Sequence, residues 1–213
     1  MPARMAMDLL MRAAVRRVIA AEPPCCEPES LAAETGVDPD LARALLPSTE
    51  AVLKAIAESA LRRQLDHITR KLGAVSSDSP AEQLIALGRA FVGWAAENKD
   101  DFRLLNSPLL NRVIAEDEIR RYHQALQQLT ISMLGRARDQ GQLRNDIDPL
   151  LLSLVARAFT YGLARLCVDD QLNFWLPNQD DLEENARLNM ALETMADILL
   201  VGWNPDQPIR SEA

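Results

Sequence analysis

The chain has 213 residues, is 48% hydrophobic and carries a formal net charge of −8 at pH 7. That length and apolar fraction suffice for one substantial core or for two small domains. No run of about 18 uninterrupted apolar residues occurs, so we expect no membrane span. The N-terminus also lacks the apolar run of a signal peptide, which indicates a cytoplasmic protein.

Disulfide, metal and cofactor chemistry are not indicated. The cysteines, Cys25, Cys26 and Cys167, are too few and too unevenly placed for a disulfide scaffold. His67 and His123 do not have the spacing of a metal-binding motif. No nucleophile elbow, phosphate-binding loop or dinucleotide fingerprint occurs. We therefore expect no metal, no cofactor and no enzymatic activity.

Helical periodicity dominates the sequence and alternating runs are nearly absent, so we predict an all-α fold. Helix starts are marked by a capping residue before proline, as at Ser79-Pro80 and Asp148-Pro149. Gly73 and Gly141 mark helix ends. The predicted helices, roughly nine in number, cover residues 5–21, 28–35, 39–46, 48–72, 80–97, 99–106, 108–140, 149–169 and 181–201.

Three short helices come before longer ones, which is typical of a small head joined to a helical bundle. We therefore predict a three-helix head at residues 1–50, a body at 51–203 and a flexible tail at 204–213. The most apolar segment of the body, residues 150–168, contains Arg157 and Arg165. We expect it to form a buried helix.

The head contains the pattern of a helix-turn-helix. Gly36 interrupts one short predicted helix, and Asp38-Pro39 begins another only two residues later. Two helices joined by a turn of about three or four residues that contains glycine form this motif. In DNA-binding proteins the second helix enters the major groove.

Several segments, in order along the chain, resemble the tetracycline-repressor (TetR) family. The resemblance implies an N-terminal DNA-binding head and a C-terminal bundle that binds a ligand and dimerises. It implies a homodimer that binds palindromic double-stranded DNA and acts as a ligand-responsive repressor. The segments that carry it are Ala13-Ala14-Val15, Leu31-Ala32, Gly36-Val37, Pro47-Ser48, Glu50 to Leu53, Ala90 to Lys99, Phe102 to Leu105, Gly141 to Arg144, Asp146 to Pro149 and Tyr161 to Ala164.

The head departs from the family pattern in its charged residues. Arg43 stands where members usually have tyrosine, and Thr49 stands where they usually have lysine. Six basic and eight acidic side chains between residues 1 and 54 give a net charge of −2, which is unfavourable because DNA affinity normally comes from Lys and Arg. The expected DNA-binding residues are Arg12, Arg16, Ser30, Asp38, Asp40, Arg43, Ala44 and Thr49.

Apolar stripes at helical spacing occur within residues 84–94 and 119–133. Such stripes usually fill a core, and the alternative is a cavity for a small apolar effector. Gly88 and Gly93 are expected to let neighbouring helices approach closely. The expected lining residues of the cavity are Phe91, Trp94, Phe102, Leu105, Tyr122, Leu126, Met133, Phe159 and Arg165.

A buried arginine such as Arg165 needs a partner. One interpretation is a carboxylate on a neighbouring helix, and the other is the anionic head group of a ligand. The candidate carboxylates are Glu183, Glu184, Glu193 and Asp197.

The last long helix has more apolar surface than one neighbour can cover, which predicts an interface. We expect a twofold dimer in which this helix and the 149–169 helix of each copy form a four-helix bundle. A dimeric ligand-binding or protein-interaction module without sequence-specific DNA binding is the alternative function. The expected interface residues are Leu188, Ala191, Leu192, Met195 and Leu199.

Overall fold

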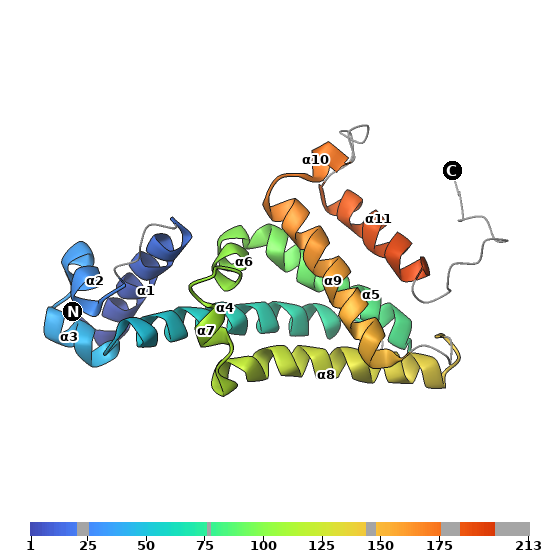
Figure 1. The fold of residues 1–213 in the computed structure, drawn as a ribbon, viewed down its shortest axis with the longest axis horizontal. Coiled ribbons are helices and arrows are strands. Elements are labelled where there is room, and N and C mark those ends of the chain that lie inside the picture. The colour runs from blue at the N-terminus through green and yellow to red at the C-terminus, as the bar shows by residue number, and fades with distance from the viewer. Residues whose placement is uncertain (21–25, 76–77, 144–147, 176–183, 199–213) are drawn as a thin grey trace. The chain divides into compact units, whose positions relative to one another are not determined.

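The chain is all-α in a computed structural model that describes residues 1–20, 26–75, 78–143, 148–175 and 184–198. These residues form eleven helices and no strand (Figure 1), so the predicted fold class is confirmed. The helices are α1 (Ala3–Ile19), α2 (Pro28–Thr35), α3 (Pro39–Leu45), α4 (Thr49–Leu72), α5 (Pro80–Glu97), α6 (Lys99–Leu105), α7 (Asn111–Ile114), α8 (Asp117–Asp139), α9 (Pro149–Val168), α10 (Leu172–Trp175) and α11 (Glu184–Ala196).

The chain divides into two compact units. The first comprises Met1–Asp66 and Asn98–Gln124, and the second comprises His67–Glu97 and Ala125–Ala213. Helices α4 and α8 each begin in the first unit and continue along the chain into the second. The predicted boundary at residue 50 lies inside the first unit and stays a prediction. The predicted tail, 204–213, lies outside the described residues.

One predicted helix, 108–140, is interrupted. Helix α7 ends at Ile114 and α8 begins at Asp117, with Glu116 in the bend between them. The Glu116 carboxylate pairs with Lys54 of α4 at 3.3 Å. Val113 before the bend and Ile119 after it are both buried. The break therefore lets the chain bury apolar residues on either side of the bend, which periodicity alone did not predict.

The first unit is built around α1, which packs against α2, α3 and α6. One face of α1 is rich in alanine, and Ala6, Leu10 and Ala13 are fully buried on it. Small side chains let the short helices approach closely, and Leu31 of α2 fills the remaining space. Outside the α1 core, Arg63 of α4 forms a bidentate ion pair with Asp101 of α6, at 2.7 and 2.8 Å. This pair links α4 to α6 within the first unit.

The second unit is built around α5, which packs against α9 and α11. A Cβ atom added at Gly88 would lie 3.3 Å from Leu192 Cδ2 and 3.4 Å from Thr160 Cγ2. Gly88 therefore permits the close approach that the sequence predicted. The same expectation for Gly93 is wrong, because a Cβ atom there would meet nothing within 4 Å.

Helix α9 is less buried than expected. Its mean hydropathy of 1.4 over 18 residues would suit a membrane span by length and composition, which is weak evidence, and only 33% of that window is buried. Leu151 and Leu154 are 61% and 65% exposed. The expectation of a buried helix is therefore wrong, because α9 covers α5 with one face and leaves leucines on the other.

We expect Gly88→Leu to lower the free energy of unfolding by about 1–3 kcal/mol, because a large side chain would push α9 and α11 away from α5. The matched control is Gly135→Ala in α8, where an added Cβ atom meets nothing within 4 Å. That change should raise the free energy of unfolding by up to about 1 kcal/mol, because alanine favours helix. Urea denaturation followed by circular dichroism measures both. A Gly88→Leu protein as stable as the parent would contradict this packing.

Candidate functional site

The turn between α2 and α3 has the geometry of a helix-turn-helix. Helix α2 ends at Gly36, whose φ of +70° is the left-handed conformation that glycine adopts easily. Val37 is buried and anchors the turn. The Asp38 carboxylate caps α3 by accepting hydrogen bonds from the backbone N–H groups of Asp40 and Leu41, both at 3.0 Å. The predicted turn is therefore confirmed, and the Asp38 side chain is engaged as a helix cap.

Three of the predicted DNA-binding residues share the exposed face of α3. Arg43 and Ala44 follow Asp40 by three and four positions, so the three residues lie on one side of the helix. All three are exposed. Arg12 and Arg16 are exposed on α1. The two remaining candidates, Ser30 of α2 and Thr49 at the start of α4, are half-buried.

Arg43, on the exposed face of α3, forms ion pairs with two carboxylates of the first unit. Arg43 donates to Glu29 Oε1 at 2.7 Å from Nε and to Asp40 Oδ1 at 3.0 Å from Nη1. The pKa of Glu29 is lowered by a hydrogen bond from its own backbone N–H and by Arg43. The pKa of Arg43 is raised, mainly by its hydrogen bond to Glu29. Both side chains are half-exposed, so solvent weakens the pair.

A second group of ion pairs joins α1 to α2. Arg16 donates to Glu34 Oε1 at 2.9 Å, and Arg17 donates to Glu34 Oε2 at 2.8 Å and to Ser30 Oγ at 2.7 Å. The hydrogen bond from Arg16 is the largest cause of the lowered pKa of Glu34. Arg12 has no ion-pair partner among the described residues. Most of the positive charge on the head is therefore already paired.

The residues predicted to line a ligand cavity are divided between the two units. Phe91 and Trp94 pack as a tilted pair with ring centroids 6.5 Å apart, and both are buried in the second unit. In the first unit the Tyr122 hydroxyl donates to Glu58 at 3.0 Å. The cavity that would join the whole set stays a prediction. The first unit holds Phe102, Leu105 and Tyr122, and the second holds Phe91, Trp94, Leu126, Met133, Phe159 and Arg165.

The expected buried environment of Arg165 is wrong. Arg165 is exposed and donates to Asp169, one turn along its own helix, at 2.6 Å. Glu193, one of the carboxylates proposed for it, pairs with Arg89 instead. Two other proposed partners, Glu183 and the side chain of Glu184, lie outside the described residues.

Arg157 is stabilised by aromatic rings. Its guanidinium lies 4.4 Å from the ring centroid of Phe91 and 5.8 Å from that of Tyr161. Although Arg157 lies at the surface of α9, burial against these rings lowers the pKa of its guanidinium below the ordinary value. A cation over an aromatic face gains attraction from the ring without a carboxylate partner.

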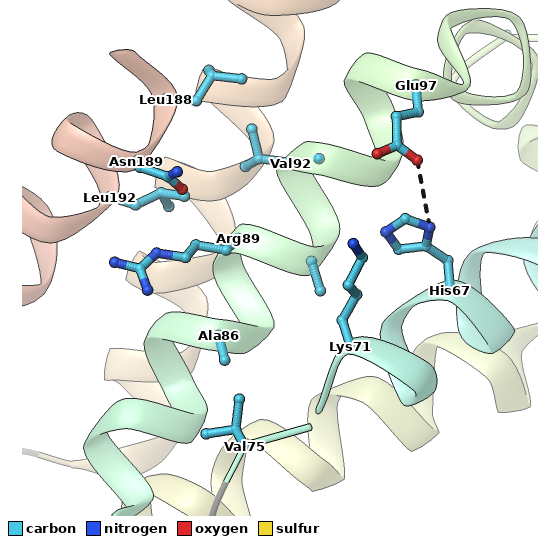
Figure 2. Close-up of a pocket in the computed structure, with 12 residues that line it drawn as sticks. His67, Lys71, Val75, Ala86, Arg89, Val92, Glu97, Leu188, Asn189 and Leu192 are labelled. Carbon is cyan, nitrogen blue, oxygen red and sulfur yellow. Dashed lines mark ion pairs between the residues drawn. The ribbon is translucent and has the colours of Figure 1, made fainter. Parts of the chain in front are cut away.

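A pocket of about 330 Å³ lies within the second unit, between the end of α4, α5 and α11. Figure 2 shows Lys71 and His67 extending from α4 toward Glu97 on α5. The pocket contains none of the residues predicted to line the effector cavity. Two predicted interface residues, Leu188 and Leu192, line it instead, and they are only 3% and 2% exposed. Within this unit α5 already covers them, and the dimer interface predicted for them stays a prediction.

His67 is the most buried polar side chain of the pocket. Its Nδ1 lies 3.8 Å from Glu97 Oε2, an ion pair when the imidazole is protonated (Figure 2). Burial lowers the pKa of His67, Glu97 opposes this effect, and the charges of Lys71 and Arg70 add to it. The neutral imidazole is therefore the form that the folded chain favours. Sequence reasoning missed this pocket, because most of its lining residues are small or aliphatic and come from three separate segments.

Comparison with known proteins supports one family. Residues 84–189, about half of the chain, match the family described as tetracyclin repressor-like, C-terminal domain. Among curated proteins, none matches the sequence.

Several solved structures share the fold. A protein of unknown function from Rhodococcus sp. RHA1 is 21% identical, with a TM-score of 0.70, over 91% of this chain and 94% of its own. A regulatory protein of the tetR family from Rhodococcus RHA1 is 18% identical, with a TM-score of 0.66, over 92% and 97%. The structure of AibR in complex with isovaleryl coenzyme A and operator DNA is 14% identical, with a TM-score of 0.61, over 94% and 99%.

The lowered pKa of His67 predicts a specific pH dependence. The unfolded chain takes up this proton near the ordinary histidine pKa of about 6.5, and the folded chain takes it up only at lower pH. Stability is therefore fully present above the ordinary pKa. It falls as the pH drops below that value, and the fall levels off below the folded-state pKa.

We expect His67→Gln to remove this part of the acid sensitivity. The free energy of unfolding of the parent, relative to the variant, should decrease as the pH is lowered from about 7 to about 5. Urea denaturation at a series of pH values measures the difference. A constant difference over this range would contradict the assignment.

Proposed function

The chain belongs to the tetracycline-repressor family, and on this premise we propose that it is a ligand-responsive repressor that binds palindromic double-stranded DNA as a homodimer. The observation that carries the proposal is the helix-turn-helix, in which Gly36 and the Asp38 cap leave Asp40, Arg43 and Ala44 exposed together on α3. A second helix presented in this way suits the major groove. AibR, a protein of the same fold, has been solved with isovaleryl coenzyme A and operator DNA.

Helix α4 is the element through which a ligand would act on DNA. It begins at Thr49, one of the expected DNA-binding residues, and its last turns carry His67 and Lys71 of the second-unit pocket. A ligand that favours one position of this helix would favour one spacing of the two heads in a dimer. Because half-sites on DNA are a fixed distance apart, a change in spacing changes the affinity for the operator.

The ion pairs of the head determine how DNA would be bound. Arg43 must leave Glu29 or Asp40 before it can contact a phosphate or a base edge. Arg16 must likewise leave Glu34. The carboxylates that are left behind would then lie near phosphates and repel them. The same pairs therefore favour the second candidate function, a dimeric ligand-binding or protein-interaction module without sequence-specific DNA binding.

The surface proposed for dimerisation is the exposed apolar face of α9. Leu150, Leu151, Leu154 and Val155 lie on adjacent turns and are between 48% and 65% exposed. Met190 of α11 and Ile198, two residues after its end, are exposed, and the predicted interface residues Ala191 and Met195 are half-buried. Leu199 lies outside the described residues. Contact with a second copy would remove these side chains from water, which is the main source of stability in such interfaces.

DNA binding can be tested by selecting bound duplexes from a random pool at low and moderate salt. We expect a palindromic sequence to be enriched. Arg43→Ala should weaken binding to it by about 10- to 100-fold, the range for loss of a base contact. Glu29→Gln should strengthen binding, because it frees Arg43. Arg120→Ala, which removes an exposed arginine paired with Asp117 on α8, is the charge-matched control and should have little effect.

The absence of binding at low salt, by both the parent and Glu29→Gln, would contradict the repressor proposal. The second candidate function would then stand, since it requires no DNA contact.

Dimerisation can be tested by sedimentation equilibrium. We expect the parent to be a dimer and Leu154→Glu to be a monomer, because a carboxylate at the centre of an apolar interface loses its hydration. Leu129→Glu on α8, which also changes an exposed leucine of the second unit, is the control and should remain dimeric. A dimeric Leu154→Glu protein would place the interface elsewhere.

A further inference from the structure

The pocket between α4, α5 and α11 combines an apolar wall with a polar rim. Val92 of α5 and Leu188 and Leu192 of α11 form part of the wall, and His67 and Lys71 lie on the rim (Figure 2). All of the lining residues belong to the second unit. Its volume of about 330 Å³ is near the lower end of the range for small-molecule sites.

Within the part of the chain that the structure describes, some of the charged side chains around the pocket form ion pairs, and others do not. The Arg89 guanidinium is directed toward α11 (Figure 2) and pairs there with Glu193. His67 faces Glu97, and its neutral form is favoured. Lys71 is exposed and has no ion-pair partner among the described residues. The pocket therefore offers one ammonium group that forms no ion pair with the described residues, beside an imidazole that can donate or accept a hydrogen bond.

We propose that this pocket binds a small aliphatic monocarboxylate. The carboxylate would pair with the Lys71 ammonium, and the alkyl chain would lie against Val92, Leu188 and Leu192. The single ammonium of Lys71 suits one negative charge, and the Glu97 carboxylate on the same rim disfavours a ligand that carries a second one.

This site is separate from the effector cavity predicted around Phe91 and Met133, because neither residue lines the pocket. It touches α4 at His67 and Lys71, within the last two turns of that helix. Its regulatory consequence rests on the proposed function, whereas binding itself does not. The two ideas can therefore fail independently.

Binding is tested on the full chain, labelled at leucine and valine methyl groups and titrated with hexanoate in NMR experiments without DNA. Hexanoate should shift the methyl signals of Val92, Leu188 and Leu192 in a saturable manner. Hexanamide, which has the same shape without the charge, should bind at least about tenfold more weakly, the scale of a lost charge-assisted contact. Inorganic phosphate should leave the same methyl signals unshifted.

Two variants test the pocket in different ways. Lys71→Met should weaken hexanoate binding by about tenfold or more, whereas Arg70→Met, which removes the neighbouring cation outside the pocket lining, should leave it nearly unchanged. Gly93→Leu should block binding by filling the pocket, because an added Cβ atom at Gly93 meets nothing within 4 Å. Its thermal unfolding should show that the fold is retained.

The proposal is overturned if hexanoate causes no saturable shifts, if hexanamide or phosphate binds as tightly, or if Lys71→Met and Gly93→Leu bind hexanoate like the parent. DNA selection with the parent protein reports on the proposed function separately. Hexanoate binding without DNA binding would support the proposed pocket ligand and contradict the repressor proposal. DNA binding without hexanoate binding would support the repressor proposal and contradict the pocket ligand.

Discussion

The close contact at Gly88 is the constraint on which the second unit depends. Leu192 of α11 and Thr160 of α9 both come within 3.4 Å of the place where a side chain would begin. Leu192 then also forms part of the wall of the pocket beside α5. A larger residue at position 88 would therefore alter the helix packing and the pocket together.

Several arginines of the chain form ion pairs with nearby carboxylates. Arg43, Arg63 and Arg165 each have such a partner within hydrogen-bonding distance. Exposed pairs of this kind add little stability, but they reduce the positive potential that a DNA backbone would meet. Arg157 is satisfied by aromatic rings, and Lys71 forms no ion pair with the described residues. Because Lys71 also lines the pocket, it is the cation placed to receive an anion there.

The sequence predicted local structure better than side-chain environments. The capping residues Ser79 and Asp148, each followed by proline, placed two helix starts correctly, because capping depends on residues a few positions apart. The left-handed Gly36 and the Asp38 cap were likewise evident from their neighbours. These signals are local, and so they can be read without knowing the tertiary packing.

Features that depend on distant residues were missed. The break at Glu116 depends on Lys54 and on apolar residues buried to either side of the bend. The apolar stripe of α11 predicted that it would be covered, and it did not reveal that α5 would cover Leu188 and Leu192. The pocket depends on three segments meeting. Its small and aliphatic lining residues look like ordinary core residues in the sequence.

The pairing of Arg16 and Arg43 with acidic neighbours has a consequence for the search along a genome. Non-specific DNA attracts proteins through their uncompensated cations. Most repressor molecules in a cell are therefore bound non-specifically to genomic DNA. A head in which Arg16 and Arg43 already have partners would bind non-specific DNA only weakly. More of the protein would then remain free, and occupancy of an operator would depend more on base contacts than on the total amount of DNA in the cell.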